Sequence, residues 1–331
     1  MKKLFFTSAL LITALFFNSC SSDDDASAVL PTPTPTPVAS NTIVDFVSAN
    51  SNYSSLGAAL EAANLVDVLN GTTEYTVFAP NNDSFAAFLS DNGFASLDAV
   101  PVDVLTQVLL NHVITGTALS TDLSTSYIKT NATFGTTTNN LDMYINTTDG
   151  VMINGTTAVT SADITVDNGV IHAVDAVIGL PTVVTFATAD STFETLVAAL
   201  TREDDFPFVD LLSEANDGTT SAPFTVFAPT NDAFANLLSE GLGFDTLAGI
   251  PTATLASTLS THVVDGANVL STDLEDGMTV TTKGDTFVIN TMPSATFTDQ
   301  NDRMGNIIVT DVQAANGVIH VVDEVILPNL N

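Results

Sequence analysis

The sequence predicts an α+β protein built from two copies of one domain. A fourteen-residue block that begins at Thr76, TVFAPNNDSFAAFL, returns 149 residues later at Thr225 as TVFAPTNDAFANLL, with ten identities. Other blocks recur in the same order along the chain. Each copy also begins with apolar residues at helical spacing and ends with alternating, β-branched runs, and helices followed by strands indicate the α+β class.

The recurring blocks fix the expected domain boundaries. They are YSSLGAAL and FETLVAAL, NHVITGTALSTDL and THVVDGANVLSTDL, and NGVIHAVDAVI and NGVIHVVDEVI, at separations of 140, 150 and 148 residues. Repeats at a near-constant spacing indicate a tandem duplication. We therefore expect a first domain over 41–180 and a second domain over 181–331. The second domain has nine extra residues before Pro223, which we expect to form a surface loop.

The N-terminus predicts export and attachment to a membrane. Residues 1–19 join two lysines to an apolar run from Leu4 to Phe17, too short to span a bilayer and typical of a cleaved signal peptide. Cys20, the only cysteine, follows at the position of the acylated residue in a bacterial lipoprotein, which it resembles. The alternative is an ordinary secreted protein with a free thiol.

Residues 20–40 are acidic and then rich in Pro and Thr. Alternating prolines favour an extended polyproline II conformation, so we expect a stalk. The acidic cluster resembles the surface-export signal of lipoproteins in Bacteroidota. We therefore expect an outer membrane lipoprotein exposed at the cell surface, and otherwise a secreted or periplasmic protein.

The charge of the chain argues against two kinds of partner. There are 38 acidic residues against six basic ones. Because nucleic acids and anionic lipid surfaces are bound through Lys and Arg, neither is expected as a partner, and contact with the membrane is expected through the lipid anchor only.

The block that opens each repeat predicts a strand that turns into a helix. Thr76 to Ala79 can form a strand, and Pro80 prevents its continuation in the centre of a sheet. Asn81, or Thr230 in the second domain, can cap the helix that follows. A structural requirement of the fold is therefore enough to explain why this block is repeated.

Three of these motifs resemble those of the fasciclin (FAS1) family: the TVFAP block, the block around His112 and His262, and the NGVIH block. They occur twice in the same order. The resemblance covers both domains and implies a β-wedge of about seven strands with packed helices, and an adhesion role outside the cell. It also implies that the middle motif binds partners: Asn111 and His112, and Thr261 and His262. The family has Tyr-His at this place, so Asn111 and Thr261 depart from its pattern.

All four histidines fall in the repeated motifs, yet we expect them in the core rather than in a catalytic or metal site. His112 and His262 continue apolar helical stripes, and His172 and His320 share strand faces with valines. No metal-ligand motif accompanies them.

REDDF at Arg202 is expected to be a solvated turn.

The acidic loop around Asp299, Asn301 and Asp302 is suggestive of calcium. Arg303, however, stands where a calcium loop needs an oxygen ligand. We therefore expect a solvated loop and no cofactor, although Ca²⁺ stays possible in a chain with so many Asp residues.

The expected function is a non-catalytic, lipid-anchored adhesion module. Its partner would be extracellular matrix, a surface glycan or another cell-surface protein. The alternative is a surface protein that captures a polysaccharide or a small molecule. A hydrolase is a third class, for which the sequence provides no nucleophile paired with a base.

Overall fold

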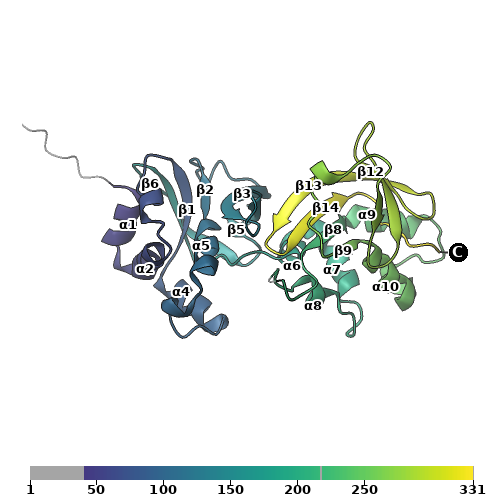
Figure 1. Ribbon diagram of the computed structural model, residues 1–331, viewed down its shortest axis with the longest axis horizontal. Coiled ribbons are helices and arrows are strands. Elements are labelled where there is room, and N and C mark those ends of the chain that lie inside the picture. Colours follow the sequence, from purple (N-terminus) through teal and green to yellow (C-terminus); the bar gives the residue numbers. More distant parts are fainter. Residues whose placement is uncertain (1–40, 217, 331) are drawn as a thin grey trace, which may run out of the picture. The chain divides into compact units, whose positions relative to one another are not determined.

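The computed structural model describes residues 41–216 and 218–330 (Figure 1). The expected signal peptide, the lipidation site Cys20 and the stalk lie outside this range. The helices and single 3₁₀ turns of the first domain are α1 (Ile43–Ala49), η1 (Ser51–Tyr53), α2 (Ser54–Ala62), α3 (Val66–Leu69), α4 (Asn82–Asp91), η2 (Leu97–Ala99) and α5 (Val102–Leu110). Those of the second domain are α6 (Val183–Ala189), η3 (Ser191–Phe193), α7 (Glu194–Leu200), α8 (Phe208–Leu212), α9 (Asn231–Ser239), η4 (Leu247–Gly249), α10 (Thr252–Thr261) and η5 (Ser271–Asp273).

Each domain contains one seven-stranded sheet. In the first domain the strands are β1 (Tyr75–Pro80), β2 (Val113–Thr115), β3 (Ser126–Thr133), β4 (Asn140–Asn146), β5 (Met152–Ile153), β6 (Thr157–Val166) and β7 (Gly169–Val174), in the order β2-β1-β7-β6-β5-β4-β3. In the second domain they are β8 (Phe224–Pro229), β9 (Val263–Asp265), β10 (Thr279–Thr281), β11 (Thr286–Asn290), β12 (Thr296–Thr298), β13 (Met304–Ala314) and β14 (Gly317–Val322). Their order, β9-β8-β14-β13-β12-β11-β10, is the same. The α+β class and the seven strands predicted for each domain are confirmed.

The central strands β1 and β7 run parallel, whereas the other paired strands of the sheet are antiparallel. Their residues are buried almost throughout, as expected for apolar strands covered on both faces. Because side chains alternate along a strand, Val77 and Ala79 of β1 pack with the helices, while Phe78 packs on the opposite face against strand residues such as Met143 and Ile145. Each sheet thus separates two cores.

The expected strand-to-helix corner is present in both domains. β1 ends at Pro80, and the side chain of Asn81 accepts a hydrogen bond from the backbone N–H of Ser84 at 2.9 Å. Thr230 caps α9 in the same way, on the N–H of Ala233 at 3.1 Å. Both caps satisfy backbone donors that the helix itself leaves unpaired, so the predicted caps are confirmed.

The extra residues of the second domain lie on either side of α8, in segments 201–207 and 213–221, where every described residue is exposed or only partly buried, in agreement with the expected surface loop. They surround α8, whose Phe208 and Leu212 are buried in the domain core. The amide of Asn316 donates to the carbonyl of Leu212 at 2.8 Å, as the amide of Asn168 donates to Leu69 at 2.7 Å. The helix therefore takes the place of α3 in the second domain.

Two segments that we expected to be solvated are held by arginines. The guanidinium of Arg202 donates to the carbonyls of Leu247 and Ile250 at 2.9 and 2.7 Å, which ties the REDDF segment to η4. Arg303 pairs with Asp299 at 3.0 Å, and the Asp299 side chain is fully buried. Polarity alone predicted that these segments are solvated. It did not predict that the two arginines are paired with protein groups and hold the segments in place.

No single helix among the described residues is long and apolar enough to cross a membrane. One bent pair, Val183–Ala189 with Ser191–Leu200, meets the criteria of length and composition across a 93° bend.

Candidate binding site

The structure gathers the repeated polar residues around one short loop in each domain. We call residues 116–120, which follow β2, the β2 loop, and residues 267–271, which follow β9, the β9 loop. Each loop leaves the strand that comes directly after the histidine motif. The four histidines hold either such a loop or the helix and strand that lead into it.

Thr76, in the central strand β1, fixes the middle of the β2 loop. Its side chain is fully buried, and its hydroxyl donates to the carbonyl of Gly116 and accepts from the N–H of Ala118, both at 2.8 Å. One buried hydroxyl therefore satisfies two backbone groups of the loop, which is why a strand of apolar residues carries a threonine here.

His172, in β7, holds the same loop from the neighbouring strand. The ring is fully buried, and Nε2 lies 2.9 Å from the carbonyl oxygen of Ala118 while Nδ1 lies 3.2 Å from the backbone N of Asp163. Because a carbonyl can only accept and an N–H can only donate, the proton sits on Nε2. His172 of β7 therefore connects β6 to the β2 loop through one hydrogen bond to each.

Asp163 fixes the far end of the β2 loop. Its carboxylate accepts from the backbone N–H and the hydroxyl of Ser120 at 2.7 and 2.6 Å, and these hydrogen bonds lower the pKa of Asp163. The residue has a positive φ of 62° and lies at an irregularity in the pairing of β6 with β7. Such bulges redirect a side chain out of the regular strand pattern, here toward the loop.

The second domain repeats this arrangement. The equivalent hydrogen bonds join Thr225 to Ala267 and Val269 at 2.9 Å, His320 Nε2 to Val269 at 2.9 Å, and the Asp311 carboxylate to Ser271, whose N–H lies at 2.7 Å. One atom departs from the pattern: Nδ1 of His320 has no hydrogen-bond partner among the described residues.

His112 and His262 hold the segments that lead into the loops. Nδ1 of His112 donates to the carbonyl of Val108 at 2.7 Å, and Nε2 accepts from the N–H of Ile178 at 2.8 Å. Burial disfavours the charged ring and lowers the pKa of His112, and likewise that of His262, to about 4. Both are neutral near pH 7. The expectation that the histidines lie in the core is confirmed, since all four are at most 3% exposed.

The four residues that the family resemblance suggested for binding are inside the protein. Asn111 and Thr261 are fully buried, as their histidine neighbours nearly are. The amide of Asn111 donates to the carbonyl of Gly179 at 3.0 Å, and the hydroxyl of Thr261 donates to Ser257 at 2.9 Å. Both side chains therefore bond to residues outside the β2 and β9 loops and are not available at the surface.

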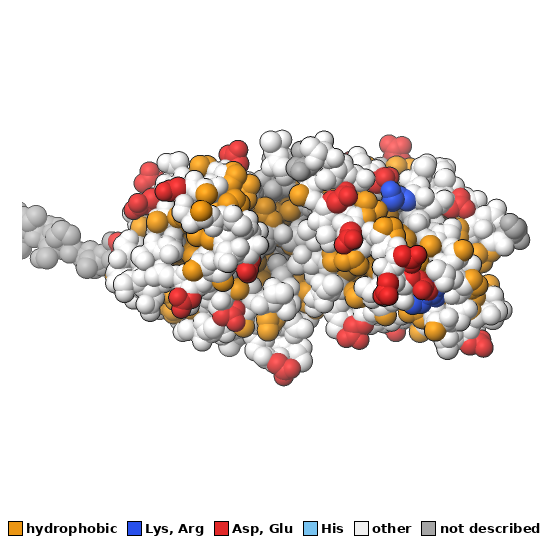
Figure 2. All heavy atoms as spheres, turned by 90° about the horizontal axis from the view of Figure 1, so that it is seen from below, with side chains coloured by type: hydrophobic (Ala, Val, Ile, Leu, Met, Phe, Trp, Pro, Cys, Tyr) orange, Lys and Arg blue, Asp and Glu red, His pale blue; other side chains and the backbone are white. Residues whose placement is uncertain are grey.

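Sequence reasoning missed Ser120 and Asp163 as parts of the site. The signal was present, because an aspartate stands nine residues before the histidine of NGVIH in both domains, and Ser120 lies in the repeated STDL. Within the described residues no three His, Cys, Asp or Glu side chains are grouped so that they could hold a metal ion. The face shown in Figure 2 carries scattered carboxylates and few cations.

The chain consists of two α+β domains with the same order of strands, and it belongs to the fasciclin domain family. The family model matches residues 51–181 and 191–328. Protein sll1483 of Synechocystis sp. is 35% identical over 138 residues, which cover 41% of this chain and 72% of that protein. Transforming growth factor-beta-induced protein ig-h3 of Sus scrofa is 28% identical over 272 residues, which cover 79% of this chain but only 36% of that protein.

A solved structure shows the same fold. It is a FAS1 domain pair from the insect cell adhesion molecule Fasciclin I, with a TM-score of 0.51, 18% identity, and coverage of 84% of this chain and 98% of that one. FAS1 domains thus occur in a cell adhesion molecule.

Proposed function

We propose that the protein is a non-catalytic adhesion module that binds extracellular matrix, a surface glycan or a cell-surface protein through its β2 and β9 loops. The observation that carries this proposal is the duplicated clamp, in which a threonine, a histidine and an aspartate hold each loop. A loop that is ordered before binding loses less conformational entropy when a partner docks. The presence of FAS1 domains in the cell adhesion molecule Fasciclin I supports the same function.

The exposed part of the site follows from the burial pattern. Thr117 is exposed and Leu119 is 37% exposed, whereas the Thr76 and His172 side chains behind them are fully buried. A partner would contact the exposed loop residues, and the buried residues would set the loop shape. Two loops on one chain raise the effective concentration of the second contact when both engage.

The absence of catalysis is part of the proposal. The histidine nitrogens that could act as bases are committed to backbone groups, with the exception of Nδ1 of His320, which is buried. A general base must reach the proton that it removes. A hydrolytic activity that disappears on replacing His112 or His262, with folding intact, would contradict this.

We also propose that Cys20 is acylated and that the module stands on the outer surface of the outer membrane. The support is the position of Cys20 after an apolar run and before an acidic, Pro-rich segment. Several buried acyl chains, at about 0.8 kcal/mol for each methylene, give stable anchoring. Protease added to intact cells should release the domains, and Cys20→Ser should move the protein to the medium or the periplasm.

The adhesion test changes the loops without touching their clamps. Leu119→Arg and its counterpart Leu270→Arg should each weaken attachment of protein-coated beads to cells or matrix, and the double variant should lose most of it. Met292→Arg is the matched control, because Met292 is 78% exposed on the turn between β11 and β12. Attachment by the double variant at the level of the control would refute the loop site.

A second candidate, capture of a small molecule, is favoured by one specific observation, a cavity in the second domain. It is argued separately because it does not depend on adhesion.

A further inference from the structure

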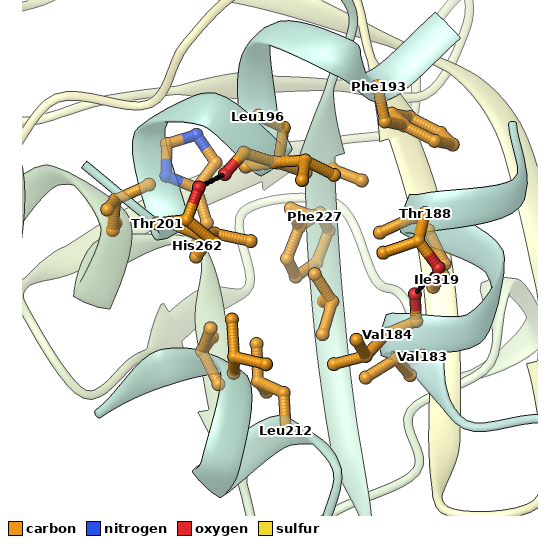
Figure 3. A pocket seen from close by; sticks show the side chains of 18 residues that line it. Val183, Val184, Thr188, Phe193, Leu196, Thr201, Leu212, Phe227, His262 and Ile319 are labelled. Carbon is orange, nitrogen blue, oxygen red and sulfur yellow. Dashed lines mark hydrogen bonds between the residues drawn. The ribbon is translucent and has the colours of Figure 1, made fainter. Parts of the chain in front are cut away.

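A cavity of about 110 Å³ lies inside the second domain (Figure 3). Helices α6, α7 and α8 contribute lining residues, as do the central strand β8 and the region around His262. Phe193, Leu196, Phe227 and Ile319 are among its buried walls. The cavity belongs to one domain and is separate from the β9 loop.

The lining has no polar group free to bind a ligand. Of the eighteen lining side chains, only those of Thr188, Thr201 and His262 carry polar atoms. The hydroxyls of Thr188 and Thr201 donate to the carbonyls of Val184 and Val197 at 2.9 and 2.8 Å, the bonds dashed in Figure 3. Both ring nitrogens of His262 bond to backbone groups. A water molecule needs two to four polar partners, so such a cavity is dry and suits an apolar group.

Comparison of the two domains shows that these two helices pack differently beside the cavity. The helix pair α1 and α2 corresponds to α6 and α7, and both pairs start from a capping box, at Thr42 and Thr182. In the first domain Val47 of α1 faces Gly57 of α2, where an added Cβ would lie 3.5 Å from Val47 Cγ1.

At the corresponding places the second domain has Ala187 and Val197, both of which line the cavity. The larger side chain of this pair thus lies on the second helix here, and on the first helix in the first domain. Ala187 lines the cavity with a small, partly buried side chain, so a larger side chain at this position can fill it.

The cavity has a mouth. Val184, Ala187, Val197 and Val209 line it and are only partly buried, and Thr188 and Thr201 at the ends of α6 and α7 are exposed. A ligand longer than the cavity can therefore leave its other end in water. The mouth lies on a chain with a formal charge of −32, and the neighbouring Glu194 and Asp210 are exposed, so an anionic head group would be repelled.

We propose that this cavity binds the end of a neutral aliphatic chain, with the polar head of the ligand outside the mouth. A cavity of ~150 Å³ accepts benzene, so the space here takes about four to six carbon atoms. Burial of these methylene groups against the apolar lining provides the binding free energy.

The test uses chain Ser40–Asn331, which is a compact unit by itself, and three probes of equal carbon number. 1-Hexanol should shift the NMR methyl resonances of Val184, Leu196 and Val197 in a saturable way. Hexane-1,6-diol should bind at least about tenfold more weakly, because one hydroxyl would have to enter a site without polar partners. Hexanoate should also bind more weakly than 1-hexanol.

Two variants control for folding. Ala187→Val fills the cavity with the side chain found at Val47, and it should weaken 1-hexanol binding at least about tenfold while the melting temperature is kept or raised. Val47→Ala makes the opposite change in the first domain and should leave binding unchanged. Absence of saturable shifts at these methyls, or equal binding by Ala187→Val, would overturn the proposal. Equal binding of the diol or of hexanoate would overturn the assignment to a neutral chain end.

Discussion

Nε2 of His112 accepts a hydrogen bond from the backbone N–H of Ile178 at 2.8 Å, and His262 accepts from Ile326 at 3.0 Å. In each domain the ring thereby joins the end of the helix before the β2 or β9 loop to the segment after the last strand. The bond requires an unprotonated Nε2, because a protonated ring nitrogen can only donate. The fold of both domains therefore depends on neutral histidines.

This relationship predicts a loss of stability in acid. A histidine in the unfolded chain titrates near pH 6.5, whereas His112 and His262 in the folded chain titrate at about 4. The unfolded state binds more protons in this interval, so the contribution of each ring is complete above pH 6.5 and is lost as the pH falls toward 4. We expect a loss of about 2–3 kcal/mol per histidine by pH 4.

Urea unfolding between pH 7 and 4 measures this effect in each domain. All four tyrosines lie in the first domain and the chain has no tryptophan. The hydroxyls of Tyr127 and Tyr144 donate to Asp190 of the second domain, so both are replaced by Phe in the measured chain. The fluorescence of Tyr53 and Tyr75 then reports on the first domain, and circular dichroism reports on both. His112→Asn should be less stable at pH 7 and should flatten the pH dependence seen by fluorescence. An unchanged slope in this variant would show that the carboxylates, not His112, cause the acid sensitivity.

The clamp on the β2 loop predicts the effect of removing one hydroxyl. Thr76→Val keeps the volume but leaves the N–H of Ala118 and the carbonyl of Gly116 without their common partner. We expect a loss of about 1–3 kcal/mol. Hydrogen exchange should show faster exchange at Ala118, while Thr225→Val should have the same effect at Val269 and none on Ala118. Retained protection at Ala118 would contradict the assigned role of Thr76.

The buried carboxylate of Asp299 predicts that Arg303 is essential to the stability of the second domain. Arg303→Met removes the guanidinium that pairs with Asp299 at 3.0 Å and with Glu240 at 2.6 Å. Breaking a buried pair by removing one partner costs about 3–5 kcal/mol. Thermal unfolding should show this loss, and Asp299→Asn in the same chain should recover part of it. Wild-type stability in Arg303→Met would disprove the ion-pair role.

The same geometry predicts that calcium is not needed at this loop. The guanidinium of Arg303 already provides the positive charge beside Asp299 and Glu240 that a cation would provide. The melting temperature of the wild-type protein should therefore be equal in Ca²⁺ and in a chelator. A rise of several degrees with Ca²⁺ that Asp299→Asn abolishes would place a calcium site here.

The close approach of the central strands predicts that one glycine cannot be replaced. A Cβ on Gly169, which has a φ of 147°, would lie 1.9 Å from the carbonyl oxygen of Tyr75. Because the obstacle is backbone in a parallel strand pair, relief requires the two strands to separate. Gly169→Ala should prevent the first domain from folding, whereas Gly93→Ala, with no heavy atom within 4 Å of its added Cβ, should cost only the strain of its positive φ. A soluble, cooperatively unfolding Gly169→Ala protein would refute this.

The duplication, the α+β class, the strand-to-helix corners and the burial of the histidines could all be predicted from the order of the residues. These features depend on local chemistry: Asn81 and Thr230 cap helices through residues three positions away, and the valines beside His172 show which strand face is apolar.

The places where the polar residues act became known only from the folded chain. Thr76, Ser120, Asp163 and His172 lie far apart in the chain and meet at one loop only because β7 pairs with both β1 and β6. The role of Arg303 was not predicted, because two of its partners, Glu240 and the carbonyl of Val325, are 63 and 22 residues away from it. The cavity beside Ala187 depends on the fit between two helices. Hydrogen bonds and packing between residues so far apart in the chain leave no periodic pattern in the sequence. The sequence specifies how many residues separate two side chains, whereas their distance in space depends on the fold.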